Sequence, residues 1–283
     1  MRTLILLVAM GVAQAQSLLE LQEQKTIQRV QQLEAKMGGS AGFSAIDLVT
    51  GRSFGYHSST IFPTASSIKI AIMAQLYQSG VSLTDKVTIQ PSDSVGGSGH
   101  LQILLRNGPL TLTVKELITA MIETSDNTAT NQCIRLAGME KINAMLAKAG
   151  LQHTKLQRIM LDSKAARENR ENISTPADMA HLIEMVYKGK FPGTKEMLSI
   201  LELVDADMRK TIPESIQVAA KPGELPGARC ETGIIFLKKH PFALSVMSSF
   251  LDADENPVPA VTRLVFEHFQ KIEASNDYGN QLP

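Results

Sequence analysis

The sequence predicts an α+β fold of two lobes: an α/β sandwich, in which helices flank a five-stranded antiparallel sheet, and an all-helical lobe. Three observations predict it. Strand patterns lie near both ends of the 283-residue chain, helical patterns fill its middle, and a helical pattern follows the last strand. A sheet assembled from both chain ends leaves the middle to form a second lobe. We expect one domain over residues 16–283, with the sheet lobe at 16–60 and 190–283 and the helical lobe at 61–189.

The N-terminal elements are a helix and a pair of strands. Residues 17–36 repeat apolar side chains at helical spacing, and two glycines at 38–39 end the pattern. The stretch AGFSAIDLVTGRSFGYHS reads as two strands around a turn at 50–51.

The rest of the chain is helical first and then strand-like. From Pro63 to about Gly189 the signals are almost all helical, interrupted by glycines at 96–99 and a polar stretch at 164–172. After Glu214 the stretches SIQVAAK, ETGIIFLKK and FALSVMSSFL predict three strands, and a closing helix follows Pro259.

The composition argues against several classes of partner. The chain is 43% hydrophobic and 20% charged, with a formal net charge of +0 and no tryptophan. A neutral chain has no field that attracts nucleic acid or an anionic membrane, and the few aromatic residues offer no platform for base stacking. We therefore expect a small-molecule substrate and no nucleic acid. We also expect a monomer.

The first fifteen residues resemble a secretory signal. MRTLILLVAMGVAQAQSL has one arginine, an apolar run and an Ala-Gln-Ala cleavage site at 13–15. A short buried helix is the alternative. No cysteine stands at the cleavage site, and no later run reaches the roughly 18 apolar residues of a membrane span. We expect a secreted or periplasmic protein without stable membrane insertion.

The cysteines and histidines predict no metal site. Cys133 and Cys230 either form a disulfide or are two buried thiols, and the six histidines are scattered singly. No metal-ligand spacing is present, so we expect neither a metal nor a cofactor.

Three short motifs carry the chemistry. They are Ser66-x-x-Lys69 before an apolar run, Ser-Asp-Asn at 125–127 opening a helical pattern, and Lys-Pro-Gly at 221–223 at the end of a predicted strand. Each has a simpler interpretation: a lysine that reaches solvent, a helix N-cap, and a strand ending in a turn. Their joint occurrence in this order makes coincidence improbable.

On these motifs the chain resembles the penicillin-recognising serine enzymes, and within them the class A β-lactamases and related D,D-peptidases. FPTASSIK, GSGHLQ, LTVKELITAMIETSDNTATN and STPADMA look like that family at the expected separations. The resemblance covers nearly the whole mature chain. It implies that Ser66 is the nucleophile, Lys69 its base or proton relay, Ser125 the donor to the leaving nitrogen, and Lys221 the charge that holds Ser125 and the substrate carboxylate.

The resemblance also implies the substrate-binding residues. Asn127 binds Lys69 and the substrate amide, and the backbone N–H groups of Ser66 and Glu224, beside Gly223, form the oxyanion hole. Pro222 stands where the family has a hydroxyl residue, which fits only an edge strand. Arg229 is either a substitute anion contact or a solvated surface residue.

A second departure concerns deacylation. In class A enzymes a loop glutamate activates the deacylating water. Here Arg158 matches the loop's arginine and Asn172 its acidic partner, so the glutamate position falls on Met160. Asp162 is the candidate deacylation carboxylate, or else a capping residue.

From the resemblance as a whole we expect a class A β-lactamase-like serine hydrolase acting on a β-lactam. The alternatives are a D,D-peptidase acting on D-Ala-D-Ala peptides and a non-catalytic peptidoglycan-binding relative.

Overall fold

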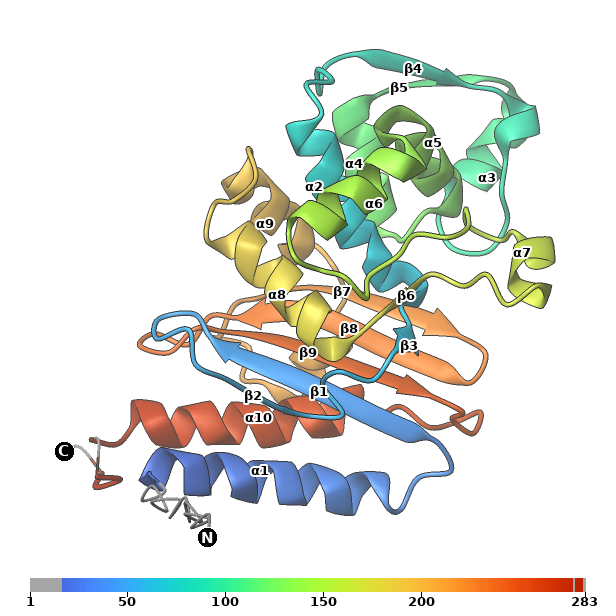
Figure 1. Cartoon of the computed structure of the whole chain (residues 1–283). Coiled ribbons are helices and arrows are strands. Elements are labelled where there is room, and N and C mark those ends of the chain that lie inside the picture. Colours follow the sequence, from blue (N-terminus) through green and yellow to red (C-terminus); the bar gives the residue numbers. More distant parts are fainter. Residues whose placement is uncertain (1–16, 277, 282–283) are drawn as a thin grey trace, which may run out of the picture.

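One five-stranded sheet forms the centre of the fold (Figure 1). The computed structural model describes residues 17–276 and 278–281, so the predicted signal at 1–15 lies outside the described residues. Every strand of this sheet is antiparallel to its neighbours, and the predicted fold class is confirmed. In spatial order the strands are β2 (Ser53–Tyr56), β1 (Ser40–Asp47), β9 (Phe242–Ser249), β8 (Ala228–Ile235) and β7 (Val218–Leu225).

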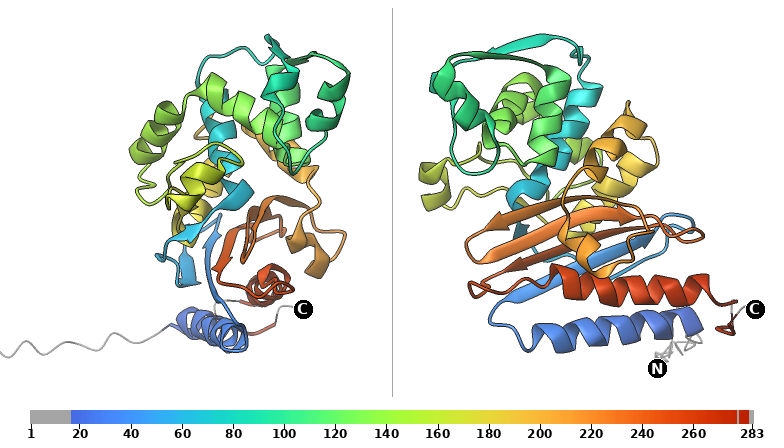
Figure 2. Two further views of the ribbon diagram at one scale, coloured as in Figure 1. Left: turned by 90° about the vertical axis from the view of Figure 1, so that its right-hand side faces the viewer. Right: turned by 180° about the vertical axis from the view of Figure 1, so that it is seen from behind.

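Two helices from opposite ends of the chain cover one face of the sheet, as Figure 2 shows. α1 (Leu18–Glu34) begins at Ser17, whose side chain forms a capping box with Glu20. α10 (Val258–Glu273) packs beside it. Phe43, on the strand face beneath them, is fully buried in this half of the core. The sequence pattern predicted both helices, and their positions are confirmed.

The opposite face of the sheet supports the helical lobe (Figure 1). α8 (Pro176–Tyr187) packs directly on β1, β8 and β9, and the buried helix α2 (Lys69–Gln78) packs against it from the helical lobe. The remaining helices are α3 (Leu101–Leu104), α4 (Val114–Glu123), α5 (Asn127–Ala137), α6 (Met139–Lys148), α7 (Ser163–Arg167) and α9 (Thr194–Glu202). The 3₁₀ turns are η1 (Ala65–Ile68), η2 (Pro91–Asp93), η3 (Leu105–Asn107) and η4 (Asp207–Thr211).

Two small strand pairs interrupt the segment that the sequence predicted as almost entirely helical. β4 (Lys86–Ile89) pairs with β5 (Leu110–Thr113), and β3 (Phe62–Pro63) pairs with β6 (Ile173–Ser174). Strands of two to four residues are too short to show a period of two, which explains why the sequence pattern missed them.

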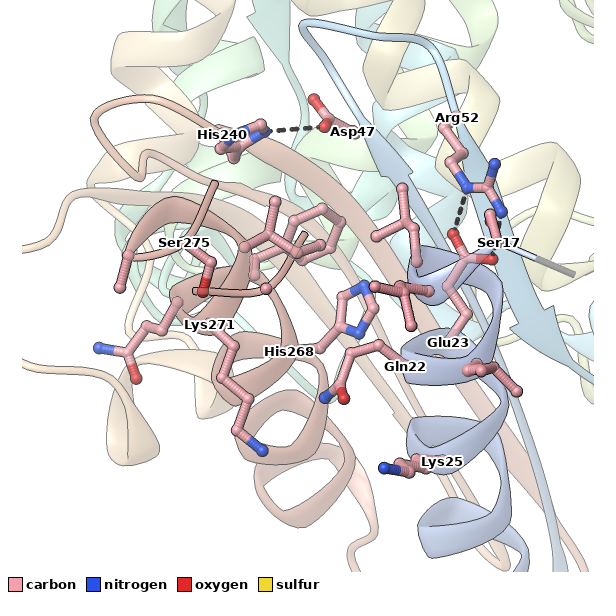
Figure 3. A pocket seen from close by; sticks show the side chains of 18 of the residues that line it. Ser17, Gln22, Glu23, Lys25, Asp47, Arg52, His240, His268, Lys271 and Ser275 are labelled. Carbon is pink, nitrogen blue, oxygen red and sulfur yellow. Dashed lines mark hydrogen bonds and ion pairs between the residues drawn. The ribbon is translucent and has the colours of Figure 1, made fainter. Parts of the chain in front are cut away.

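A hollow lies between α1 and α10, on the side of the sheet away from the helical lobe (Figure 3). His268 lines it and is only 2% exposed. The centre of its ring is 4.6 Å from that of Phe54, and its Nδ1 is 3.2 Å from Thr26 Oγ1. Burial lowers the pKa of His268 to about 4. The ion pair Arg52–Glu23 and a hydrogen bond between His240 and Asp47 also border the hollow.

We expect acid to destabilise the protein through His268. An unfolded histidine titrates near pH 6.5, so between that pH and about 4 the unfolded chain binds a proton that the folded chain does not. The free energy of unfolding therefore falls as the pH falls through this window, by roughly 3 kcal/mol in full. Urea unfolding at pH 7 and at about pH 4.5 measures the loss. His268→Gln should lose less over the same range, and equal losses in both proteins would contradict this explanation.

Candidate active site

Ser66 lies half-buried in the turn η1, and Lys69 is the first residue of the helix α2 that follows. The i, i+3 spacing places both residues on one side of the turn. Ala65, directly before Ser66, has a φ of +44°. This left-handed backbone costs a residue with a Cβ on the order of 1–3 kcal/mol, and such strain clusters at functional sites.

The Lys69 side chain is fully buried and donates its hydrogen bonds to the Ser-Asp-Asn segment. Its Nζ lies 2.8 Å from the Ser125 carbonyl oxygen, 3.0 Å from Ser125 Oγ and 3.3 Å from Asn127 Oδ1. The backbone N–H of Lys69 donates to the Ser66 carbonyl oxygen, but among the described residues no hydrogen bond joins the Lys69 and Ser66 side chains. Burial, and then the positive charge of Lys221, hold the pKa of Lys69 well below its usual range. An amine with a lowered pKa is able to accept a proton near neutral pH.

The Ser-Asp-Asn segment begins α5, as the sequence predicted, and its three side chains have different contacts. Asp126 is the N-cap, and its carboxylate accepts the backbone N–H groups of Ala129 and Leu101, each at 2.8 Å. Asn127 Nδ2 donates to a carbonyl of the glycine loop 3.0 Å away. Ser125 has a φ of +55° and is the second strained residue of the site. Asp126 thus braces the segment, while Ser125 and Asn127 contact the lysine.

Lys221, Pro222 and Gly223 lie inside β7 rather than at its end, which corrects the sequence prediction. The strand continues to Leu225 because its pairing with β8 continues to the turn. β7 is an edge strand, so the expected edge position of the proline is confirmed. A proline fits where the backbone faces away from β8. Because these directions alternate along a strand, we expect the N–H of Glu224 to face the same way.

β7 packs against the Ser66 turn, with Gly223 in close contact and Lys221 buried in the same strand. Lys221 is 1% exposed, and burial lowers its pKa to about 8. A Cβ built on Gly223 would lie 2.7 Å from the Thr64 carbonyl oxygen and 2.8 Å from the Ser66 backbone nitrogen. Only a glycine permits so close an approach of the strand to the turn.

Gly223→Ala should therefore reduce acylation by at least about 10²-fold, because the new methyl meets two backbone atoms and forces β7 away from Ser66. The measurement is the rate of covalent labelling by a fluorescent penicillin. Gly96→Ala is the control, since its built Cβ has its nearest neighbours at 3.7 and 4.0 Å. Similar labelling rates for both variants would show that the close approach is not needed.

Arg229 forms an ion pair within the structure. It lies opposite Glu224 across the β7–β8 pair, and the two side chains form an ion pair at 2.8 Å. Its Nη1 also donates to the carbonyls of Leu225 and Ala228 at 3.3 Å. The structure thus gives Arg229 a partner within the hairpin, whereas the sequence suggested an anion contact or a solvated residue.

The loop at 158–172 is closed by an ion pair that the sequence did not predict. Arg158 contacts Glu171 through two hydrogen bonds, at 2.8 and 2.9 Å. Asn172 was expected to be the partner of this arginine's side chain, and that expectation is wrong. Its amide oxygen accepts the backbone N–H groups of Gln157 and Arg158 instead, and its Nδ2 donates to the Arg158 carbonyl.

Met160 and Asp162 occupy different environments in this loop. Met160 is 8% exposed, and the Asn131 amide holds its backbone: Oδ1 accepts the Met160 N–H at 2.8 Å, and Nδ2 donates to its carbonyl at 3.3 Å. Asp162 is the N-cap of α7 and accepts the Ala165 N–H at 2.9 Å. Asp162, the carboxylate nearest to Met160 along the sequence, therefore caps a helix.

Sequence reasoning missed Asn131 and the contact made by Cys230. Asn131 follows Asn127 by four residues and so shares its face of α5, and this polar run in a buried helix was an available signal. Cys230 and Cys133 are both free and buried, and Cys230 Sγ donates to the Thr64 carbonyl oxygen at 2.8 Å. Nothing in the strand pattern around Cys230 indicates this contact.

Within residues 17–276 and 278–281, no group of His, Cys, Asp and Glu side chains is arranged to hold a metal ion. In the same part of the chain, no helix combines the length and apolar character that crossing a bilayer requires.

Comparisons with known proteins agree with the resemblance. A family model described as the beta-lactamase enzyme family matches residues 24–269. Beta-lactamase SME-1 of Serratia marcescens is 26% identical over 208 residues, which are 69% of this chain and 70% of that protein. A beta-lactamase of Bacillus licheniformis is 28% identical over 229 residues, or 77% of this chain and 74% of that protein.

Solved structures show the same fold. The crystal structure of a beta-lactamase from Sphaerobacter thermophilus DSM 20745 has a TM-score of 0.78 and 27% identity, covering 86% of this chain and 96% of that chain. PBP-A has a TM-score of 0.79 over 87% of this chain and 96% of its own. It is 23% identical in sequence, so this likeness is evidence for the fold alone. A singly substituted PBP-A, also at 23%, was solved as an acyl-enzyme complex with penicillin G; its TM-score is 0.79 over 88% of this chain and 97% of its own.

Proposed function

The chain belongs to the beta-lactamase enzyme family, and we propose that it is a class A β-lactamase-like serine hydrolase that opens β-lactam amides through an acyl-enzyme on Ser66. One observation carries the proposal. The buried amine of Lys69, with its lowered pKa, is held by Ser125 and Asn127 at the start of the helix that follows Ser66. A serine hydroxyl needs a base of this kind to become a nucleophile.

The proposed acylation moves one proton from Ser66 to the leaving nitrogen by way of Lys69 and Ser125. Ser66 Oγ attacks the lactam carbonyl carbon, and its proton passes to Lys69 Nζ. The carbon–nitrogen bond then breaks and Ser125 Oγ gives its proton to the leaving nitrogen. Lys69 Nζ, 3.0 Å away, replaces that proton with the one it took from Ser66. Lys221 supplies positive charge for Ser125 and the substrate carboxylate, and Asn127 binds the substrate's side-chain amide.

The oxyanion formed in this step is stabilised by the backbone N–H groups of Ser66 and Glu224. The close approach of Gly223 to the Ser66 nitrogen supports this pairing. Each donor of such a hole is worth roughly 2.7–4 kcal/mol in the transition state. Arg229 is a weaker candidate for the substrate carboxylate, because Glu224 already pairs with it.

The second candidate function is a penicillin-binding D,D-peptidase acting on D-Ala-D-Ala peptides, and Met160 favours it. A hydrolase needs a second base for the water that attacks the acyl-enzyme, and the carboxylate of Asp162 caps α7. A third candidate, a peptidoglycan-binding protein without catalysis, is disfavoured because the chain keeps all five residues of the proposed chemistry: Ser66, Lys69, Ser125, Asn127 and Lys221. For either enzyme we propose export to the periplasm or the exterior, after cleavage behind residue 15.

Met160→Glu should speed deacylation more than acylation, because it installs a carboxylate at the position where the family places its second base. If no carboxylate of the wild type reaches the deacylating water, the wild type should give a burst of one equivalent followed by slow turnover of a chromogenic penicillin. In Met160→Glu the steady-state rate should rise by about 10²-fold, the usual contribution of a general base, while the burst rate changes little.

Asp162→Asn is the matched variant in the same loop. It keeps a side-chain oxygen for the cap and removes the charge. Fast wild-type turnover without a burst, abolished in Asp162→Asn, would show that Asp162 is the base and would favour the β-lactamase. A long-lived acyl-enzyme in the wild type favours the D,D-peptidase. Absence of any covalent adduct would overturn both proposals.

A further inference from the structure

The carbonyl oxygen of Thr64, two residues before Ser66, accepts three hydrogen bonds. The Ser67 N–H donates to it at 3.0 Å and the Ser67 hydroxyl at 2.7 Å. The third donor comes from another part of the chain: the thiol of Cys230, at 2.8 Å. Thr64 itself is fully buried. This carbonyl is therefore a point where hydrogen bonding attaches the strained turn to the sheet.

The other side of Thr64 is attached to the loop at 158–172. Its N–H and its hydroxyl both donate to the Asn172 carbonyl oxygen, at 2.9 and 3.1 Å. The turn is thus clamped between this loop and β8. Because Ala65 has a φ of +44°, the turn depends on such contacts to keep its shape.

Cys230 reaches the turn because its cross-strand neighbour has no side chain. Cys230 pairs with Gly223, and a Cβ on Gly223 would lie 2.7 Å from Cys230 Sγ. The thiol is 2% exposed and also lies 3.5 Å from Ser67 Oγ. Burial raises the pKa of Cys230 to about 11, so at neutral pH it is a thiol that donates its proton. A thiolate would repel the carbonyl instead.

We propose that Cys230 is a positioning residue for the reaction: by binding the Thr64 carbonyl from β8, its thiol fixes the turn that presents Ser66 and its backbone N–H. This inference rests on the proposed function of Ser66. Cys230 itself touches no reacting atom in this scheme. It acts on the distance between the Ser66 N–H and β7. In that strand the same thiol lies 3.5 Å from the Gly223 carbonyl oxygen.

Two substitutions separate the hydrogen bond from the packing. Cys230→Ser keeps a donor of similar size, and Cys230→Ala removes it. Ile234→Val is the control: Ile234 lies four residues along β8 in the core on the same side of the strand, and the substitution also removes buried atoms, but its side chain has no hydrogen bond to lose. We expect the second-order rate of labelling by a fluorescent penicillin to fall about tenfold in Cys230→Ala, and to stay within about threefold of wild type in the other two.

Hydrogen exchange gives a second readout that does not need activity. The Ser67 amide, which donates to the same carbonyl, should exchange about tenfold faster in Cys230→Ala than in the wild type, Cys230→Ser or Ile234→Val. Equal labelling rates in all four proteins, or equal loss in Cys230→Ser and Cys230→Ala, would overturn the proposal. If the wild type is not labelled at all, the proposed function fails, and Ser67 exchange unchanged in Cys230→Ala would then overturn the positioning role on its own.

Discussion

Ser66→Ala should abolish the covalent adduct with penicillin and reduce turnover on the order of 10⁶-fold, the scale seen when a nucleophilic serine is removed. The reason is chemical. The acyl-enzyme is an ester of the Ser66 oxygen, and Ala offers no oxygen. Intact-mass measurement after incubation with penicillin reads out the adduct, and a chromogenic substrate reads out turnover.

Ser67→Ala is the matched control, one residue further along the same turn. Its hydroxyl is fully buried and donates to the Thr64 carbonyl, so it does not face the substrate. We expect this variant to form the adduct. An adduct that persists in Ser66→Ala, or that disappears only in Ser67→Ala, would contradict the assignment of the nucleophile.

Lys69→Ala should slow acylation by roughly 10²–10⁴-fold, the usual range for loss of a general acid–base group. Burial and the charge of Lys221 lower the pKa of Lys69, which favours the unprotonated amine that takes the proton of Ser66. The labelling rate of the wild type should therefore rise with pH as this amine loses its proton, up to the pKa of about 8 at which Lys221 loses its own charge. In Lys69→Ala that rise should be absent.

Lys115→Ala is the control for a lysine without this environment. Lys115 is on the surface, where it pairs with Glu196. Its loss should leave labelling unchanged at every pH. An unchanged acylation rate in Lys69→Ala would mean that the Ser66-x-x-Lys69 spacing carries no chemistry.

The sequence predicted the strands and the motif positions because both depend on local patterns. The alternation around 50–51 and the apolar runs after Glu214 define strands without reference to the rest of the chain. Pro222 predicted an edge strand, because a proline cannot complete an interior ladder, and β7 is the edge. Each inference needed only the covalent properties of a few residues.

The contacts that hold the site could not be predicted, because they join segments distant in sequence. Cys230 is 166 residues from Thr64, and Asn131 is 29 residues from Met160. The arginine of the loop pairs with Glu171 rather than with the next residue, since the path of the backbone decides which side chain faces it. Arg229 has a partner for a similar reason, the register of the β7–β8 hairpin.

The sequence also did not predict the backbone strain at the site. Ala65 and Ser125 both adopt positive φ, which neither residue type favours. Only the surrounding contacts impose this conformation: the clamp on Thr64 for one, and the capping contacts of Asp126 for the other. The motif spacing indicated that these segments meet, and the structure adds how their geometry is maintained.

The most direct test of the central claim is the intact mass of the wild-type protein after mixing with penicillin G, followed by peptide mapping. Opening a β-lactam leaves the nitrogen attached to the acyl group, so acylation adds the mass of one whole penicillin. We predict one such adduct, located on Ser66 in the peptide that contains PTASSIK. An unchanged protein mass at every time point, with the penicillin recovered intact, would contradict the account.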